Sequence, residues 1–367
     1  MIINQLTLTN FRCFKEKKVT FDGRIVVVEG ANGSGKSSLL EALHYCCYLR
    51  SFRTHLNREL VHLGHAQFFA HVDFEQEQLG TKDVIHVGYS EAEGKTVKCN
   101  QKTVQSYKEL IGAYRIVTLS ADDVALVQGA PEHRRNFLNY ALMLHQPDLL
   151  ALFKRYRTIL DHRNSLLSLP PTTSNEEELA IWSAKLWHEA AVIRQERIAY
   201  LVALETQINQ LLATYFHDEE AALSVSLTYN ARNITAAAIS FEAFWPAYHV
   251  KHCSFEREVR RSLFGAHLDD FGITFQDKRA RVYASRGQQK LLVLLIKIAQ
   301  LQQLSQRGEP GVLLLDDFMT DFDHRRVEQG IEALKNLRFQ MFLSCPIDAR
   351  VVLRNLSSQD ICRIQVP

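Results

Sequence analysis

Hydrophobic and polar positions change their period several times along the chain. Residues 25–28 form a β-branched apolar run, which is typical of a buried strand. Between about residues 60 and 119, short segments such as 68–74 and 84–89 alternate apolar and polar side chains. Glycine-containing turn sequences separate these segments, for example around Gly94. This part of the chain is therefore predicted to form an antiparallel sheet.

Apolar residues recur at helical spacing from Pro131 onward. Pro131 suits the first turn of a helix, which we expect to run without a break past Tyr156. The polar, Pro-rich stretch 168–175 interrupts this pattern, and Asn175 is expected to cap a second helix that continues to Tyr215. Two long helices joined by such a turn predict an antiparallel helical arm.

A glycine-rich loop follows the strand at residues 25–28 and leads into a helix-forming segment. The loop consists of Gly30, Ala31, Asn32, Gly33, Ser34, Gly35, Lys36 and Ser37. A phosphate-binding P-loop requires a strand, then the sequence G-x-x-x-x-G-K-[ST], then a helix, and all three occur here in this order. An ordinary glycine-rich turn would not require the flanking strand and helix. The glycines let backbone N–H groups surround an anion. Lys36 is expected to reach the β- and γ-phosphates of ATP, and the Ser37 hydroxyl is expected to bind Mg²⁺.

A second apolar run, at residues 312–315, ends in the acids Asp316 and Asp317. It follows a turn sequence at 308–311, so it is predicted to be a buried strand with carboxylates at its C-terminal end. In a P-loop protein the first acid, Asp316, is expected to hold Mg²⁺. Asp317 is then placed to orient or deprotonate the attacking water.

A candidate helix start lies between these two motifs, at Ser285, Gly287 and Gln288. Unpaired N–H groups at a helix start can bind an anion, although a capped core helix would have the same sequence. In its order of motifs the chain resembles the head of an ABC-type ATPase. There the S-x-G-Q signature touches the γ-phosphate bound to the opposite subunit, so that ATP holds a dimer together.

Further segments resemble the RecF family of bacterial recombinational repair. They lie at residues 6–12, 50–54, 129–138 and 265–270, and with the three motifs above they span essentially the whole chain. The resemblance implies an α/β fold: a P-loop ABC-type ATPase head with a mixed sheet, an antiparallel β subdomain and an inserted antiparallel helical arm. We expect residues 1–125 and 255–367 to form the head and residues 126–254 the arm.

The same resemblance implies a function in DNA replication and repair. An ATP-dependent homodimer would act as a clamp on gapped or single-stranded DNA. It would assist recombinase loading and the SOS response, together with RecR- and RecO-type mediator proteins. By the same resemblance Asp323, in the D-loop position, is expected to contact the nucleotide.

Several positions depart from the family pattern. Ala266 and Leu268 replace a proline and an arginine, the turn at 344–346 offers no switch histidine, and residues 120–123 contain no Q-loop glutamine. We therefore expect an ATPase that is slow at most. A scaffold that binds ATP with little hydrolysis and an SMC- or Rad50-like chromosome ATPase remain alternatives, and an ABC transport subunit is disfavoured by the arm.

Composition and charge add modest constraints. The chain has 367 residues, of which 46% are hydrophobic and 23% are charged, as in an ordinary globular protein. Its seven cysteines lack C-x-x-C or Cys/His ligand spacing, which predicts neither disulfides nor a zinc site. No signal peptide or membrane span is evident, so a cytoplasmic protein is expected.

The formal net charge of +2 is not that of a strong nucleic-acid binder. DNA binding is thus inferred mainly from the family resemblance. The candidate DNA-facing patch consists of Arg134, Arg135, Lys154, Arg155 and Arg157.

Overall fold

The computed structural model of the chain describes nine segments, at residues 1–76, 80–216, 223–233, 240–306, 311–317, 322, 324–337, 339–345 and 361–366. The chain folds into two units. The first unit comprises Met1–Val124, Gln207–Leu223 and Ala284–Pro367. The second unit comprises Ala125–Thr206 and Ser224–Tyr283.

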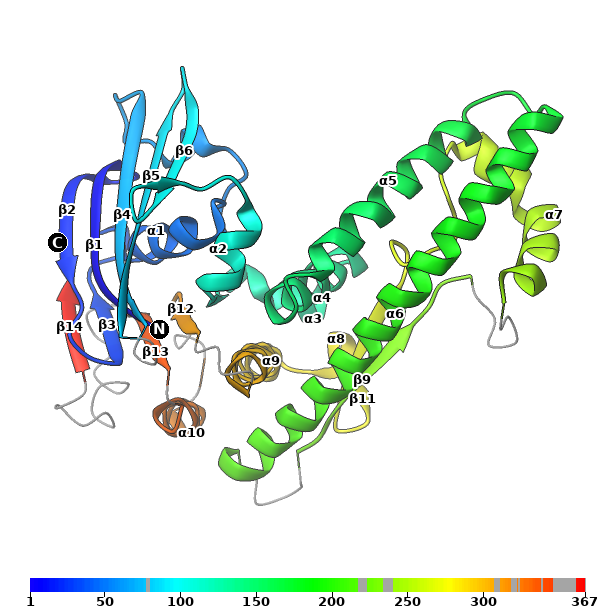
Figure 1. The fold of residues 1–367 in the computed structure, drawn as a ribbon. Helices are drawn as coiled ribbons and strands as arrows, with labels where there is room; N and C mark the ends of the chain where they lie inside the picture. The colour runs from blue at the N-terminus through cyan, green and yellow to red at the C-terminus, as the bar shows by residue number, and fades with distance from the viewer. Residues whose placement is uncertain are drawn as a thin grey trace. The chain divides into compact units, whose positions relative to one another are not determined.

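The first unit contains a six-stranded antiparallel sheet with the strand order β2-β1-β4-β5-β6-β7 (Figure 1). Its strands are β1 (Ile2–Phe11), β2 (Phe14–Thr20), β4 (Gln67–Gln76), β5 (Thr81–Ser90), β6 (Gly94–Cys99) and β7 (Lys102–Thr103). Along β4, the apolar side chains of Phe68, Ala70, Val72 and Phe74 are buried while the residues between them are more exposed. The predicted alternation is thereby confirmed, and it gives this sheet one buried face.

A second sheet of this unit is parallel and has the order β14-β3-β13-β12-β8. Its strands are β3 (Ile25–Glu29), β8 (Ile116–Leu119), β12 (Val312–Leu315), β13 (Gln340–Cys345) and β14 (Ile361–Gln365). Every residue of β8, β12 and β13 is buried, as expected for strands covered on both faces. The strand β13 lies between β3 and β12, so the two predicted nucleotide-binding strands are not neighbours.

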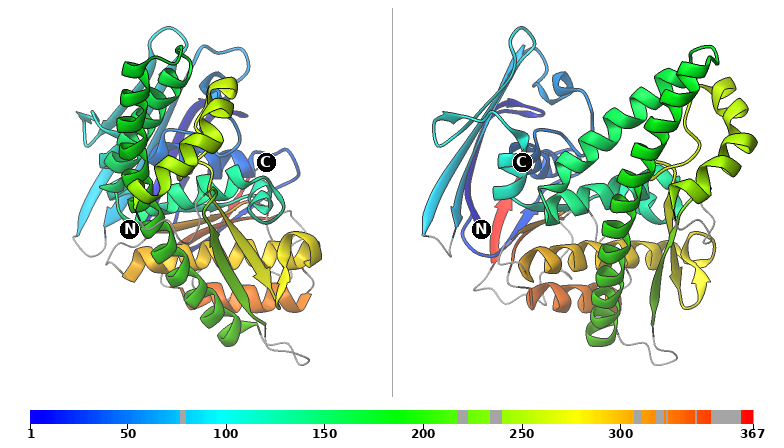
Figure 2. Two further views of the ribbon diagram at one scale, coloured as in Figure 1. Left: turned by 90° about the vertical axis from the view of Figure 1, so that its right-hand side faces the viewer. Right: turned by 45° about the vertical axis from the view of Figure 1, so that its right-hand side comes forward.

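Helices cover both faces of the parallel sheet. Helix α1 (Lys36–Tyr48) contacts β1, β4 and β5 as well as β8 and β13, so it lies between the two sheets (Figure 1). Almost all of its residues are buried. Helices α9 (Arg286–Gln306) and α10 (His324–Lys335) lie side by side on the other face (Figure 2). The short helices of this unit are η1 (Asn57–Leu60), α2 (Tyr107–Ala113) and η2 (Ala121–Val124).

The second unit is mainly helical, with a three-stranded antiparallel sheet in the order β11-β10-β9. Its helices are α3 (Ala125–Gln128), α4 (Pro131–His145), α5 (Leu149–Leu167), most of α6 (Thr173–Tyr215), α7 (Phe241–Val259) and α8 (Ala280–Tyr283). Its strands are β9 (Val225–Asn230), β10 (Asp270–Phe275) and β11 (Lys278–Arg279). Helices α5, α6 and α7 share a core that includes Leu160, Trp187, Phe244 and Phe264.

Two helix boundaries differ from the sequence prediction. The expected continuous helix from Pro131 is two helices, because Pro147 has no N–H to donate and restricts the residue before it. Gln146 accordingly has φ −137° and ψ 89°, outside the helical region. At the start of α6, the Thr172 Oγ1 accepts a hydrogen bond from the Asn175 N–H at 3.2 Å, so Thr172 caps the helix where Asn175 was expected to do so.

The boundary between the units also differs from the expected one. Residues 255–283 belong to the second unit, because α7 continues to Val259 and β10 pairs with β9. The last turns of α6 instead belong to the first unit. In the described part of the chain, no helix is long and apolar enough to cross a membrane.

Candidate nucleotide-binding site

The predicted P-loop connects β3 to α1, and its geometry requires glycine at several positions. Gly33 and Gly35 have φ values of 84° and 109°, which side chains disfavour. A Cβ on Gly30 would lie 2.4 Å from Ser34 Oγ, and one on Gly35 would lie 2.6 Å from Cys13 Sγ. A Cβ on Gly30 would collide within the loop, and one on Gly35 would collide with Cys13 and Phe14 outside it, so neither position accepts a side chain. A loop with bare backbone at these positions suits an anion cradle.

Lys36 is nearly buried at the first position of α1. Its Nζ donates to the carbonyl oxygens of Gly30 and Ala31, each at 2.9 Å. The ammonium group is thus held within the loop by neutral acceptors. The buried Ser34 Oγ has no hydrogen-bond partner within the described protein. Together with the N-terminus of α1, these groups suit the binding of a phosphate.

The fold brings the P-loop serine to the acid pair. Ser37 Oγ donates a hydrogen bond to Asp316 Oδ1 at 2.8 Å, although the two residues are 279 positions apart. Both lie at the C-terminal edge of the parallel sheet, Ser37 in the first turn of α1, after the loop that follows β3, and Asp316 directly after β12. A hydroxyl and a carboxylate oxygen in contact are the hard donors that Mg²⁺ prefers, so the residues fit the predicted metal site.

Burial raises the pKa of Asp316, while the hydrogen bonds from Ser37 and Ser344 lower it. The neighbouring Asp317 carboxylate also raises this pKa. A divalent cation would offset the cost of keeping the Asp316 charge out of water. Asp317 itself is exposed and has φ 49°, a left-handed conformation that aspartate tolerates.

Ser344 is a site residue that the sequence reasoning missed. Its Oγ donates to Asp316 Oδ1 at 2.8 Å and accepts the Asp317 N–H at 2.7 Å. The hydroxyl therefore fixes both acids from β13, the strand between β3 and β12. The sequence signal for this residue is its position as a hydroxyl side chain at the end of an apolar strand.

A buried carboxylate, Glu41, connects α1 to segments that resemble the RecF family. Arg12 donates to it through Nε at 2.8 Å and a second nitrogen at 2.7 Å, and Ser51 Oγ donates to it as well. Arg53 lies 3.8 Å away. These contacts hold the residue 50–54 segment against α1, so the segment supports the P-loop helix structurally.

The predicted signature residues form a helix cap within the single chain. Ser285 Oγ accepts from the Gln288 N–H at 3.2 Å, and the Gln288 side chain accepts from the Ser285 N–H at 2.8 Å. This reciprocal pair is a capping box at the start of α9. Ser285 is exposed and Gly287 partly exposed. Asp323 lies outside the described residues.

Only some of the residues in the expected DNA patch are exposed at the surface. Arg134 is buried and forms two hydrogen bonds of 2.8 Å with Asp270, so including it in the patch was wrong. The cause is that α4 packs on β10. Arg135 is half-buried and donates to a backbone carbonyl at 3.1 Å. Exposed side chains remain on α5 at Lys154, Arg155 and Arg157.

A P-loop whose serine contacts an acid after a buried parallel strand, with an antiparallel sheet across α1, defines an ATPase head of the ABC and SMC class. The family model described as the RecF/RecN/SMC N terminal domain matches residues 2–354. The chain belongs to the RecF family.

Relatives and solved structures agree with this assignment. The chain is 31% identical to the DNA replication and repair protein RecF of Synechococcus sp. (strain JA-3-3Ab), covering 91% of this chain and 89% of the relative. It is also 31% identical to RecF of Chloroherpeton thalassium, covering 92% of each. A solved structure of the recombination mediator protein RecF-ATP in the RecFOR pathway has a TM-score of 0.82 at 25% identity, covering 99% of this chain and 95% of that one. The Smc head domain of Pyrococcus furiosus, at 15% identity and a TM-score of 0.57, shares the fold, with coverage of 100% and 94%.

Proposed function

We propose that the chain is an ATP-dependent DNA-binding protein of recombinational repair and replication. The observation that carries this proposal is the contact between Ser37 and Asp316 beside Lys36, in a member of the RecF family. Relatives of this chain are described as DNA replication and repair proteins, and one structural neighbour as RecF-ATP.

The residues of the site divide the work of binding ATP and hydrolysing it. Backbone N–H groups of the P-loop and the Lys36 ammonium bind the phosphates. Ser37 and Asp316 would hold Mg²⁺, which neutralises phosphate charge in such sites. Asp317 orients the attacking water or accepts its proton, and Ser344 keeps both acids in position.

A second subunit completes the site in this proposal. Ser285, Gly287 and Gln288 of one subunit, with Asp323, would contact the nucleotide bound to the other. Since Ser285 is exposed at the start of α9, it is accessible to such a partner. ATP would thereby close a homodimer into a clamp on gapped or single-stranded DNA.

The DNA contact would come from α5. Lys154, Arg155 and Arg157 are exposed, and two copies brought together would double a weak basic surface. By analogy with the RecFOR pathway named for its structural neighbour, the clamp would assist recombinase loading and the SOS response with RecR- and RecO-type partners.

A variant of this function is a scaffold that binds ATP and barely hydrolyses it. It is favoured by Asp317, whose side chain is one methylene shorter than the glutamate usual at this position in ABC ATPases. Light scattering with ATP, with and without gapped DNA, tests the clamp, because a dimer should appear with ATP and be stabilised by the DNA. A protein that stays monomeric under all conditions would contradict it. ATP-dependent dimers without turnover would favour the scaffold.

A further inference from the structure

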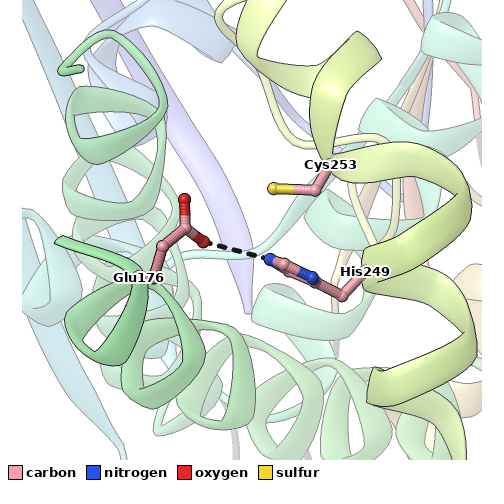
Figure 3. Close-up of side chains that lie close together, drawn as sticks. All are labelled: Glu176, His249 and Cys253. Atoms are coloured by element: carbon pink, nitrogen blue, oxygen red, sulfur yellow. Dashed lines mark hydrogen bonds and ion pairs between the residues drawn. The ribbon is translucent and has the colours of Figure 1, made fainter. Parts of the chain in front are cut away.

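Three potential metal ligands meet in the second unit, away from the nucleotide-binding residues in the sequence. Glu176 lies in the first turn of α6, and His249 and Cys253 lie one turn apart on α7. One ligand atom of each lies within 4.8 Å of those of the other two. Figure 3 shows the imidazole and the thiol both directed toward the carboxylate.

We propose that Glu176, His249 and Cys253 bind a Zn²⁺ ion that joins α6 to α7. Thiolate sulfur, imidazole nitrogen and carboxylate oxygen are the three ligand types that zinc takes in proteins. Zinc–ligand bonds of about 2.0–2.3 Å in a tetrahedron place ligand atoms about 3.5 Å apart. Small side-chain rotations are therefore enough to close the cluster around an ion. A water molecule would take the fourth position.

The surroundings of the three residues are compatible with a cation. His249 Nε2 and Glu176 Oε2 are hydrogen-bonded at 3.0 Å, and a metal ion would take the place of this hydrogen. Arg257 donates to the other carboxylate oxygen, Oε1, and to the Leu169 carbonyl, so it leaves Oε2 to the ion. Zinc bound to one carboxylate and one thiolate is neutral overall, which limits its repulsion from the Arg257 guanidinium.

Zinc binds the thiolate form of cysteine, so binding releases the thiol proton. Zinc affinity should therefore increase as the pH rises. Solvent can reach the site, since about a third of the surface of the His249 and Glu176 side chains is exposed.

The alternative to a metal site is a set of ion pairs in which Glu176 binds His249 and Arg257. In that case Cys253 only packs against Leu179 and Trp182, and its thiol binds no ligand. A spectroscopic signal from the sulfur consequently separates the two possibilities.

The experiment uses the full chain without nucleotide, titrated with Co²⁺ as a spectroscopic substitute and then with Zn²⁺ in competition. The parent should give a thiolate-to-cobalt charge-transfer band that Zn²⁺ abolishes. Cys253→Ser should lose the band. His249→Gln should weaken zinc binding by about a hundredfold or more, because the loss of a residue that only hydrogen-bonds to a metal ligand already costs about tenfold to a hundredfold.

Matched controls lie on the same helix and elsewhere in the chain. His252→Gln is three residues from His249 on α7, and Cys99→Ser removes a thiol of the first unit; both should retain the band and the affinity. Circular dichroism of Cys253→Ser checks that it is folded, and Zn²⁺ should raise the melting temperature of the parent but not of this variant. Equal zinc affinity of parent and Cys253→Ser, or no charge-transfer band in the parent, would overturn the proposal.

Discussion

Lys36 is the charged side chain of the P-loop, and its proposed role is to bind phosphate. Its ammonium group contacts only loop carbonyls in the hydrogen bonds described above, and these hold it near the α1 N-terminus. Lys36→Ala should therefore leave the fold intact while removing a charge-assisted phosphate contact. We expect ATP affinity to fall by about 1.5–3 kcal/mol, or about tenfold to over a hundredfold, in calorimetry.

A lysine of the antiparallel sheet provides the control for this prediction. Lys98 is exposed on β6, and Lys98→Ala should bind ATP like the parent. If Lys36→Ala kept the parental affinity, the assignment of the loop as the phosphate site would fail.

Asp316 and Asp317 are adjacent, yet the structure gives them different environments. Asp316 is buried against Ser37 and Ser344, whereas Asp317 is exposed and held through its backbone N–H. Asp317→Asn should bind ATP normally and hydrolyse it at least about a hundredfold more slowly, because the proposed general base is lost. Asparagine also tolerates the left-handed backbone at this position, so the fold should be retained.

Asp316→Asn is the contrasting variant, and it should weaken Mg²⁺-dependent ATP binding itself. Single-turnover hydrolysis and nucleotide binding, measured on both variants, distinguish the two roles. Parental hydrolysis by Asp317→Asn would assign that carboxylate another role.

At the scale of elements, the ion pair between Arg134 and Asp270 joins α4 to β10. Arg134 also donates to the Gly129 carbonyl at 3.0 Å, so its removal leaves several acceptors unpaired. Asp270 is 27% exposed, which reduces the cost below that of a fully buried pair. Arg134→Ala should lower the free energy of unfolding by about 2–3 kcal/mol, measured by urea denaturation.

Arg157 on α5 is the matched surface arginine, since it is 74% exposed and pairs with Asp161 one turn along the same helix. Arg157→Ala should change the free energy of unfolding by less than about 0.5 kcal/mol. It should instead lower the affinity for DNA and make that affinity less sensitive to salt concentration. An Arg134→Ala protein as stable as the parent would show that this pair does not hold α4 on the sheet.

At the scale of the whole molecule, the proposed dimer depends on the start of α9. Ser285→Arg should leave ATP binding by the monomer nearly unchanged while its bulk prevents two heads from closing on the nucleotide. Sedimentation with ATP should show monomers, and DNA affinity in ATP should fall in parallel.

Ser285→Ala separates this effect from the loss of the helix cap. Both variants lose the hydrogen bond to the Gln288 N–H, which should cost about 0.5–2 kcal/mol of stability, but alanine adds no bulk. Ser285→Ala is thus expected to dimerise. Normal dimerisation of Ser285→Arg would remove the composite site from the mechanism.

The amino-acid sequence by itself determined the features that depend on neighbouring residues. The P-loop at residues 30–37, the strand before it and the helix after it follow from local periodicity and from glycine at positions where a Cβ does not fit. The acid pair was predicted for the same reason, since turn, apolar run and carboxylates are contiguous. The break between α4 and α5 at Pro147 was not predicted, because the apolar pattern continues across it.

The tertiary structure decided which distant side chains meet. Arg134 is a surface residue by its sequence neighbours, and only the packing of α4 on β10 buries it against Asp270. Ser344 reaches both acids because β13 lies between β3 and β12, an order that local patterns do not encode. Of the proposed zinc ligands, His249 and Cys253 are four residues apart, but Glu176 lies 73 residues before His249, so the sequence does not show that the three meet. Side-chain contacts between elements depend on how those elements pack, and hydrophobic periodicity specifies only which face of each element is buried.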